Sequence, residues 1–552
     1  MFKNNIKEII MGLELKAEEK SILALFTGDK NQYIIPPYQR PYSWSEEQCR
    51  ELFEDIKRAF DDENTNEYFL GNIVTASSRE DKNRLEVIDG QQRLTTLTLL
   101  IRALLFLDKD NKKLANSIWE LNRRTGDRQE ERLKTMVFQD KDSKFLQEAL
   151  ELDLSSESCK TTKKDNLFKK NICYFYKELE QLDEDELFDF SDFLLDEVSI
   201  LPIQTQGNDK EIARENALKI FETINDRGLP LSDSDIFKAK LFSMALSESQ
   251  SELFIDRWKT LDDECQNIKY KIDDIFRFYM HIIRAKQGMT KSEIGLREFY
   301  RQDYSPFNSK DNKYSDILDD LFNIIESIKF FKNISKDSMK NQELTKWFQL
   351  IELYSNQYPI NTLFVYIYAN GLEINDKLIN FSRELVKYIY YEGATTKIKF
   401  SLFEINSSII KNELKGFTSP KEVKESDFDY FGQLKKGFAL LSLYLNQNQK
   451  AIYPYYINRI INSRDKKSLN SSWDEYNYTD YVDTIGNMLV LDYDISRDVI
   501  LSNKLKYIKN SKISETKELY EKVKDWSYDD YQERNSLLQL RLKSFFEHSN
   551  ED

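Results

Sequence analysis

Five consecutive residues, Asp89-Gly90-Gln91-Gln92-Arg93, have the types and the order that could bind an anion. They separate an apolar stretch at residues 85–88, which predicts a strand, from a second apolar stretch at residues 94–107, which predicts a helix. The first N–H groups of a helix have no partner within the helix and carry the positive end of its dipole. Glycine lets the backbone approach a phosphate, and arginine offers a planar pair of donors. The motif therefore predicts a phosphate site at a helix N-terminus.

Thr95 and Thr96 add hydroxyl groups to the first turn of this helix. The alternative is an ordinary helix start whose glutamine and arginine side chains are only solvated. Five residues do not decide between these two interpretations by themselves.

A second motif lies upstream, in the stretch Ile34 to Trp44, which contains three prolines. Because proline fixes φ and moves the preceding residue out of the helical region, this stretch predicts a stiff, extended loop. Tyr38, Gln39 and Arg40 have no amphipathic reason to lie there, and an arginine beside aromatic rings suits a nucleobase and its phosphates. The alternative is that the aromatic rings of this loop close one end of a small core.

A third element spans residues 217–238. A helix is predicted to end near Asn225 to Gly228, with glycine as the C-terminal cap, and Ser232 is predicted to cap the next helix. This pattern is typical of an ordinary connection between two helices. The functional alternative places Asn225 and Arg227 at a ligand together with the first two motifs.

Composition narrows the possible chemistry. The chain of 552 residues has a net charge of −15, whereas a dedicated duplex-DNA coat is normally basic, so DNA contacts would come from local patches or from a partner. Two histidines, His281 and His548, leave few routes to histidine-dependent hydrolysis. The four cysteines have no zinc-binding spacing and predict reduced thiols. We find no signal peptide and no membrane-spanning stretch, and we expect a cytoplasmic protein without a membrane partner.

The pattern of apolar residues predicts an α+β protein, with a small mixed α/β core followed by largely α-helical middle and C-terminal domains. The only strand-like stretch predicted within residues 108–255 is Ser199 to Thr205. The expected divisions are a core at 1–107, a helical extension at 108–255, a helical middle region at 256–430 and a C-terminal domain at 431–552.

The three motifs together resemble the N-terminal domain shared by GmrSD-type restriction proteins and the phosphorothioation-sensing SspE proteins, which has a ParB/sulfiredoxin-like core. The resemblance covers roughly residues 20–245 and implies binding, and often hydrolysis, of a nucleoside triphosphate. It implies that the catalytic residues are Gln39, Arg40, Asp89 and Arg93. The expected nucleotide-binding residues are Tyr38, Gly90, Gln91, Gln92, Thr95, Thr96, Asn225 and Arg227. Asp55 and Asp89 are the nearest carboxylates for a Mg²⁺ ion.

The resemblance also implies an HNH-like nuclease domain at the C-terminus, and residues 483–491 and 501–504 look like the end of such a domain. Its beginning departs from the pattern, because the family's Ile-Glu-His-Ile segment corresponds here to Ile457-Asn458-Arg459-Ile460. Arginine stays protonated near neutral pH and cannot replace the histidine that acts as general base. We therefore expect a degenerate HNH-like domain.

Three functions remain open. The first is an NTP-binding and NTP-hydrolysing sensor or regulatory component of a prokaryotic anti-phage, restriction-like system. Its expected partners are phage or modified DNA, an effector subunit and a second copy of the chain. The second is a DNA nickase or endonuclease with a metal site free of histidine, for which Asp465, Asp474, Asp480 and Asp483 are candidates. The third is a scaffold that holds a nucleotide as a structural ligand.

Overall fold

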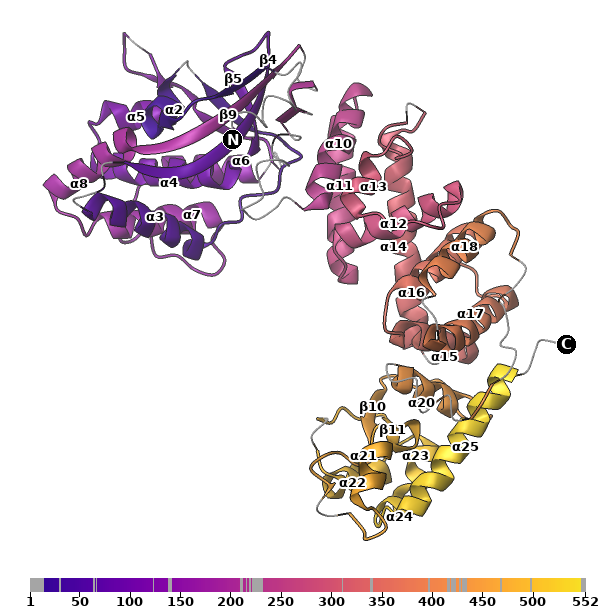
Figure 1. The fold of residues 1–552 in the computed structure, drawn as a ribbon. Coiled ribbons are helices and arrows are strands. Elements are labelled where there is room, and N and C mark those ends of the chain that lie inside the picture. The colour runs from indigo at the N-terminus through magenta and orange to yellow at the C-terminus, as the bar shows by residue number, and fades with distance from the viewer. Residues whose placement is uncertain are drawn as a thin grey trace. The chain divides into compact units, whose positions relative to one another are not determined.

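The chain forms two compact units, Met1–Trp258 and Lys259–Asp552 (Figure 1). The computed structural model describes residues 14–28, 31–62, 65, 67–122, 124–137, 141–208, 212–214, 216–217, 220, 232–309, 311–337, 341–395, 398–414, 417, 423–425, 428, 434–466, 469–496 and 499–547. The predicted α+β class is confirmed, because the first unit contains a sheet and the remainder is mostly helical.

A mixed sheet forms the frame of the first unit. Its strands are β1 (Glu14–Ala17), β2 (Lys20–Ser21), β3 (Gln32–Ile35), β4 (Tyr68–Ser78), β5 (Arg84–Asp89), β8 (Leu133–Thr135) and β9 (Val198–Gly207). They follow the order β1-β9-β4-β5-β3-β8, and β2 also pairs with β9. β3 runs parallel to both β5 and β8, and β4 runs parallel to β9 but antiparallel to β5. Because β3 and β5 are parallel neighbours, the segments that follow them leave the sheet at the same edge.

A helix buried on nearly all sides, α4 (Gln91–Leu107), follows β5 directly. Its residues from Leu94 to Leu105 are buried without interruption, as expected for a helix that is apolar around its whole circumference. In Figure 1 it lies between the sheet and the pair of helices α3 and α7. The other helices of the unit are α2 (Ile22–Thr27), α3 (Glu46–Asp61), α5 (Lys112–Ile118), α6 (Asp142–Glu151), α7 (Leu167–Leu179), α8 (Glu184–Asp192), the π-helical turn η2 (Phe193–Glu197) and α10 (Asp233–Ser247).

Local capping residues determine several of these boundaries, and Ser232 was predicted as one of them. Ser45 caps α3, and the Gln48 side chain accepts hydrogen bonds from the Ser45 backbone N–H and hydroxyl at 2.8 Å each. Ser232 precedes α10, and its hydroxyl accepts a hydrogen bond from the Asp235 backbone N–H at 3.2 Å.

Two further strands, β6 (Trp119–Leu121) and β7 (Arg128–Glu131), lie within the stretch that was predicted to be mainly helical. They form a small antiparallel sheet.

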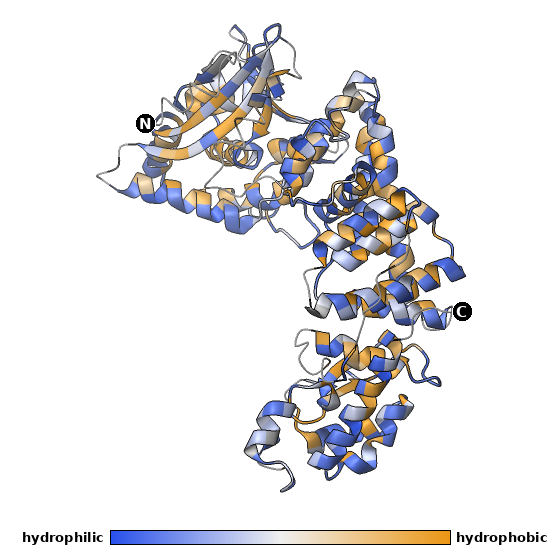
Figure 2. Cartoon of the chain, turned by 45° about the vertical axis from the view of Figure 1, so that its right-hand side comes forward, coloured by the Kyte–Doolittle hydropathy of each residue, from blue (hydrophilic) through white to orange (hydrophobic). Residues whose placement is uncertain are grey.

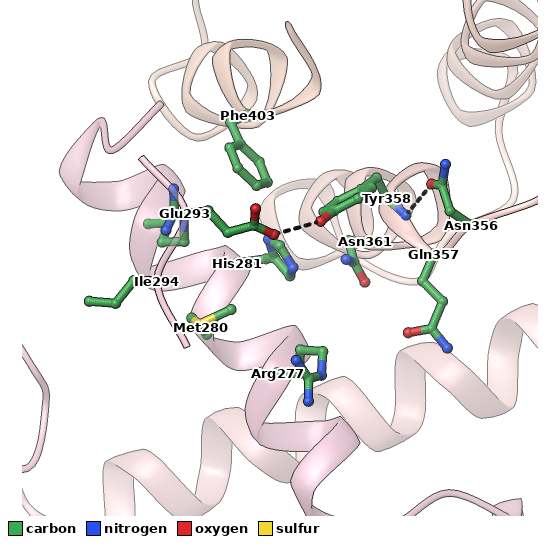
Figure 3. A pocket seen from close by; sticks show the side chains of 11 residues that line it. Arg277, Met280, His281, Glu293, Ile294, Asn356, Gln357, Tyr358, Asn361 and Phe403 are labelled. Atoms are coloured by element: carbon green, nitrogen blue, oxygen red, sulfur yellow. Dashed lines mark hydrogen bonds between the residues drawn. The ribbon is translucent and has the colours of Figure 1, made fainter. Parts of the chain in front are cut away.

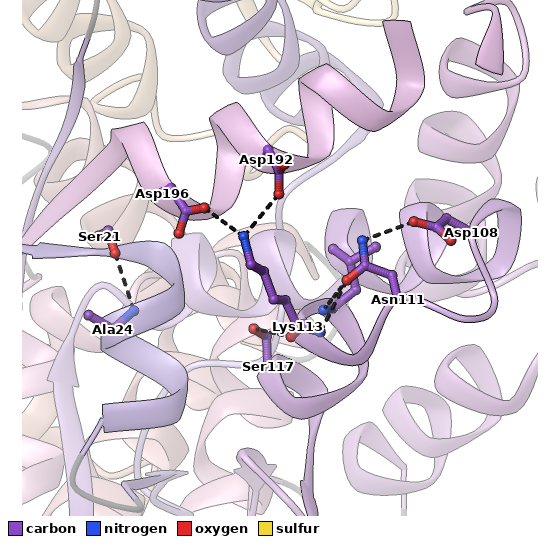
Figure 4. A network of polar contacts seen from close by, with 9 residues as sticks. Ser21, Ala24, Asp108, Asn111, Lys113, Ser117, Asp192 and Asp196 are labelled. Carbon is purple, nitrogen blue, oxygen red and sulfur yellow. Dashed lines mark hydrogen bonds and ion pairs between the residues drawn. The ribbon is translucent and has the colours of Figure 1, made fainter. Parts of the chain in front are cut away.

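Polar contacts join elements that are distant in sequence. The Lys113 ammonium group on α5 lies 3.1 Å from Asp192 and 2.9 Å from Asp196, which belong to α8 and η2 (Figure 4). Asn111 caps α5 by accepting hydrogen bonds from two backbone N–H groups of its first turn. Because both ion pairs are exposed, they add little to stability and mainly fix how α5 meets the following helices.

The prediction that all four cysteines are reduced thiols is wrong for one pair. Cys159 and Cys173, both buried, form a disulfide that joins the segment after α6 to α7. The sequence did not reveal the pair because the two residues are 14 positions apart and only the fold brings them together. Cys49 and Cys265 are free and buried.

The second unit begins with a helical array, in which apolar and polar residues alternate along the helices (Figure 2). The helices here are α11 (Ser251–Ile268, which starts in the first unit), α12 (Ile272–Gln287), α13 (Leu296–Arg301), α14 (Tyr314–Lys336), α15 (Gln342–Leu353), α16 (Tyr358–Asn370), α17 (Asp376–Thr395), α18 (Lys399–Ile410) and α20 (Lys435–Tyr444).

The last part of the chain has its own apolar core around a two-stranded antiparallel sheet. This part contains β10 (Tyr456–Arg459), α21 (Glu475–Tyr481), the 3-10 turn η5 (Ile485–Asn487), β11 (Met488–Leu491), α22 (Leu501–Lys509), α23 (Ser514–Glu518), α24 (Tyr520–Val523) and α25 (Tyr528–Glu547). Within the described ranges, no helix is both long and apolar enough to cross a membrane.

Candidate functional site

Gly90 makes the junction between β5 and α4 possible. It has a left-handed backbone conformation, with φ 88° and ψ 9°, and it is the N-terminal capping residue of α4. A Cβ atom at this position would lie 2.5 Å from Cγ2 of Ile73, so the neighbouring strand leaves no room for a side chain. Gly90 also has no side chain that could cap the helix, so it leaves the first N–H groups of α4 without a side-chain cap.

The charges of two arginines act on Asp89 at this helix start. Burial raises the pKa of its carboxyl group, against the opposing effects of the Gly90 N–H, which donates a hydrogen bond to it, and the charges of Arg93 and Arg40. The pKa of Arg93 is lowered by burial, while Asp89 and Tyr68 act in the opposite direction. One carboxylate and two guanidinium groups thus influence one another electrostatically near the N-terminus of α4, where the helix dipole is positive.

Arg93 and Arg40 differ in how they are held. Nη1 of Arg93 donates a hydrogen bond to the Asn72 carbonyl oxygen at 2.7 Å, which fixes the guanidinium group against β4. A side chain at Gly71 would begin 3.5 Å from this group, so glycine there gives the guanidinium its space. Arg40 is exposed on the loop after β3. The site therefore has one fixed arginine and one exposed arginine.

Gln39 is buried beneath the site. Its Nε2 donates a hydrogen bond to the Ile88 carbonyl oxygen at 2.9 Å, and its Oε1 accepts one from Nε2 of Gln91 at 3.3 Å. The Gln39 amide therefore links the proline loop to the end of β5 and to the first turn of α4. Gln39 and Gln91 therefore position the proline loop against the first turn of α4.

Gln92 holds the other end of the same loop. Its Oε1 accepts hydrogen bonds from the backbone N–H groups of Ser43 at 2.8 Å and Trp44 at 3.2 Å. Its Nε2 donates to the Pro41 carbonyl oxygen at 3.1 Å. The Gln92 side chain therefore joins the proline-containing loop to the N-terminus of α4.

Tyr38 belongs to an internal network. Its hydroxyl donates to Glu86 at 2.6 Å, and the Arg214 guanidinium carbon lies 5.1 Å from the centre of its ring. Arg214 also bonds both carboxylate oxygens of Glu86 at 2.9 Å. Burial and the Glu86 charge raise the pKa of Tyr38 well above its usual range. The ring lies against Phe242 with the centroids 5.2 Å apart, so Tyr38 supports the loop from inside the protein.

The two threonines of α4 are also buried. Thr96 shares a hydrogen bond of 2.8 Å with the Tyr42 hydroxyl, which accepts another from Nδ2 of Asn171 at 2.9 Å. Thr95 lines a hollow of about 10 Å³ that also borders Arg40, Gln91 and Asp142. A space of this size holds about one water molecule, so a triphosphate would lie outside it, at the exposed side of the loop.

Asp55, the second carboxylate expected at a metal, has other partners. It lies 3.4 Å from Arg58 on α3 and forms a hydrogen bond with Tyr68 at the start of β4. Across the described ranges, the structure contains no group of three or more residues suited to hold a metal ion. Asn225 and Arg227 lie outside the described residues.

Sequence reasoning missed four residues that position the site. Asn72 orients Arg93, Glu86 and Arg214 hold Tyr38, and Asp142 accepts a hydrogen bond from the Tyr42 backbone N–H at 3.1 Å. Of these four residues, only Asn72 had a signal in the local sequence, namely its position directly after Gly71. The other contacts join residues separated by 48 to 176 positions, and these depend on the tertiary fold.

The C-terminal position expected to hold a histidine carries a paired arginine. The Arg459 guanidinium group bonds Asp483, which lies 2.5 Å from the Lys435 ammonium group. Lys504 is buried, and its Nζ donates to the carbonyl oxygens of Arg459 at 2.8 Å and Ile460 at 3.2 Å. Burial lowers the pKa of Lys504 to about 8. Cationic side chains therefore occupy the region where the nuclease hypothesis needs a general base.

The candidate aspartates of this region have protein partners. Asp465 is buried and accepts hydrogen bonds from the backbone N–H groups of Asn462 at 2.9 Å and Leu501 at 2.7 Å. Asp480 forms a hydrogen bond with Tyr476. Within the described part of the chain these aspartates do not form a group that could hold a metal ion, so they remain candidates only as separate carboxylates.

Comparison with known proteins agrees with the N-terminal motifs. Residues 22–242 match the family model of the N-terminal domain of the GmrSD restriction endonuclease. The uncharacterised protein MJ0686 of Methanocaldococcus jannaschii is 25% identical over 335 residues, which cover 56% of this chain and 55% of the relative. The chain thus spans about half the length of this relative. The match over residues 22–242 supports a relationship of this chain to the GmrSD-type restriction proteins.

Proposed function

We propose that the first unit binds and hydrolyses a nucleoside triphosphate, as the sensor or regulatory component of a prokaryotic anti-phage system of the restriction type. The observation that carries this proposal is the start of α4. There is no room for a side chain at Gly90, the capping residue of α4 makes no side-chain hydrogen bond, and the charges of Arg40 and Arg93 act on Asp89.

The phosphates would be bound by the N–H groups of the first turn of α4 and by the two arginines. Charge-assisted hydrogen bonds of this kind are about twice as strong as neutral ones. Arg93 is pre-oriented by its bond to Asn72, so little conformational freedom is lost when a phosphate binds. Arg40 is exposed and can approach the phosphates from the loop.

Hydrolysis needs a group that orients water or accepts its proton. Asp89 is the carboxylate nearest to the proposed phosphate position, and its raised pKa suits proton transfer better than that of a solvated aspartate. Mg²⁺ is commonly held by one or two carboxylates together with the phosphates of the substrate, and it would neutralise phosphate charge. Asp89 fits this role better than Asp55, because Asp55 already bonds Arg58 and Tyr68.

The restriction-type relationship suggests DNA as the molecule that is sensed. The net charge of −15 disfavours a general affinity for duplex DNA, so contact would depend on local cationic patches or on an effector subunit. Arg464, Lys466, Lys506, Lys509 and Lys512 of the C-terminal part are candidates for such a patch.

The direct test is NTP turnover by the purified full chain with Mg²⁺, measured with and without modified phage DNA. The proposal predicts turnover of at least one nucleoside triphosphate that falls in Arg93→Ala and persists in Arg50→Ala. Arg50 is a matched control because it is exposed on α3 and pairs with Glu46. Binding without turnover would favour the scaffold alternative, and no binding by the wild-type chain would contradict the proposal.

A further inference from the structure

A cavity of about 430 Å³ lies within the helical array of the second unit, apart from every residue of the proposed NTP site. Three helices and two connecting segments line it, and the segment between α15 and α16 contributes Asn356 and Gln357. α12 contributes Arg277, Met280, His281 and Arg284, α16 contributes Tyr358 and Asn361, α18 contributes Phe403, and the segment between α12 and α13 contributes Glu293 and Ile294. Its volume is within the range of sites that enclose a small organic ligand.

Three buried side chains around this cavity have unsatisfied polar atoms. Nδ1 of His281, Nε of Arg284 and Oδ1 of Asn361 are buried and have no hydrogen-bond partner within the described part of the chain. These residues are only 4%, 3% and 4% exposed. Buried polar groups are nearly always paired, so the three unpaired atoms beside one cavity leave donors and acceptors for a ligand or for water. Figure 3 shows His281, Tyr358 and Asn361 directed into the same space.

The cavity is electropositive. Arg277, His281 and Arg284 follow one another at helical spacing and share one face of α12. Burial and the charges of Arg284, Arg277 and Lys399 lower the pKa of His281 to about 3, so the imidazole is neutral. Among the described residues that line the cavity, Glu293 is the only carboxylate, and it already pairs with Lys399 and accepts a hydrogen bond from the Tyr358 hydroxyl at 3.3 Å.

Aromatic rings form the apolar wall. The His281 ring lies 5.5 Å from Phe403 and 6.2 Å from Tyr358, measured between ring centroids. The Arg284 guanidinium carbon lies 4.6 Å from the centre of the Phe403 ring. Nη2 of Arg284 donates to the Met289 carbonyl oxygen at 3.2 Å, which fixes the side chain while Nε remains unpaired. A planar ring could stack here while an anionic group meets the arginines.

We propose that this cavity binds a phosphate monoester of nucleotide size, with its phosphate at Arg277, His281 and Arg284 and its ring against Phe403 and Tyr358. The charges of Arg277, Arg284 and Lys399 together exceed that of the one carboxylate, Glu293, by two, which matches the nearly dianionic phosphate monoester better than a carboxylate. Asn361 adds an unpaired acceptor that suits an N–H or O–H group of the same ligand.

The test is calorimetric titration of the full chain with adenosine 5′-monophosphate, with adenosine as the uncharged control. We expect the monophosphate to bind and adenosine to bind at least roughly tenfold more weakly, because it lacks the charge-assisted bonds. Arg277→Ala should weaken binding of the monophosphate by roughly tenfold or more. Arg277 is exposed, so this change should not disturb folding. Asn361→Ala should weaken the binding as well.

Two control variants test whether the monophosphate binds at this cavity and not elsewhere in the chain. Arg301→Ala removes an exposed arginine of α13 that does not line the cavity, and it should bind like the wild-type chain. Arg93→Ala should also retain monophosphate binding, because Arg93 belongs to the first unit. Absence of monophosphate binding, equal binding of adenosine, or unchanged binding by Arg277→Ala would overturn the proposal. Binding that is lost in Arg93→Ala but kept in Arg277→Ala would overturn it too.

Discussion

Gly90 lies so close to Ile73 that a Cβ atom at position 90 would be 2.5 Å from Cγ2 of the isoleucine. The contact joins the start of α4 to the middle of β4, and the backbone of Gly90 has a positive φ of 88°. The conformation of the proposed phosphate site therefore depends on a residue without a side chain.

Gly90→Ala should destabilise the chain by about 2–5 kcal/mol, because left-handed strain and overpacking both oppose the new methyl group. Urea unfolding of the purified chain measures the change. Gly126→Ala is the matched control, since Gly126 also has a positive φ but a Cβ atom there would meet nothing within 4 Å. Gly126→Ala should lower the free energy of unfolding by only about 1–2 kcal/mol. Equal losses in the two variants would refute the proposed contact with Ile73.

Gln39→Ala should slow NTP turnover more than it weakens NTP binding, because the Gln39 amide orders the end of β5 and the first turn of α4. Steady-state kinetics should show a lower kcat with a smaller change in KM. Hydrogen exchange at residues 90–93 should become faster in the same variant. If kcat and exchange are both unchanged, Gln39 does not position the site.

Asp89→Asn should stabilise the chain at pH 7, and this advantage should disappear as the pH falls below about 4. Burial raises the pKa of Asp89 in the folded state, so the folded chain binds the proton more tightly than the unfolded chain. The wild-type protein consequently loses stability as the pH rises through the interval between the two pKa values, and asparagine removes that loss. Urea unfolding at pH 4 and pH 7 measures the difference in free energy of unfolding between Asp89→Asn and the wild-type chain. Asp127→Asn is the control, because Asp127 is exposed. An advantage larger at pH 4 than at pH 7 would contradict this account.

The purified chain alone should neither nick nor linearise unmodified plasmid DNA in Mg²⁺ or Mn²⁺. Arg459 pairs with Asp483 where the nuclease hypothesis requires a histidine, and Lys504 donates to the Arg459 carbonyl oxygen. Arg459→His should not restore cleavage, because the neighbouring glutamate of the family segment is Asn458 here. Gel assays test both statements. Metal-dependent nicking by the wild-type chain that Asp474→Asn or Asp483→Asn abolishes would show a working nuclease instead.

The sequence predicted the local framework of the site well. Residues 85–88 and 94–107 predict a strand and a helix, and they lie in β5 and in α4, which begins at Gln91. The prediction that Ser232 caps the next helix is also confirmed. Each of these features depends on residues within a few positions of one another, and local backbone preferences determine them.

The orientation of side chains could not be predicted in the same way. Tyr38 and Thr96 were expected at a nucleotide, but they bond Glu86 and Tyr42 inside the first unit. Whether a side chain faces a ligand or the core depends on which strands are neighbours, and β3 pairs with β5 across a gap of about 50 residues. The short strands β6 and β10 escaped prediction because three or four residues carry little periodic signal.

The central claim is that the start of α4 and its two arginines bind the phosphates of a nucleoside triphosphate. Equilibrium titration calorimetry of the wild-type, Arg93→Ala and Arg50→Ala chains with nucleoside triphosphates tests it most directly. The account predicts binding by the wild-type and Arg50→Ala chains, and a loss of about 1.5–3 kcal/mol in Arg93→Ala, the contribution of a hydrogen bond to a charged group. Unchanged affinity in a folded Arg93→Ala chain would contradict it.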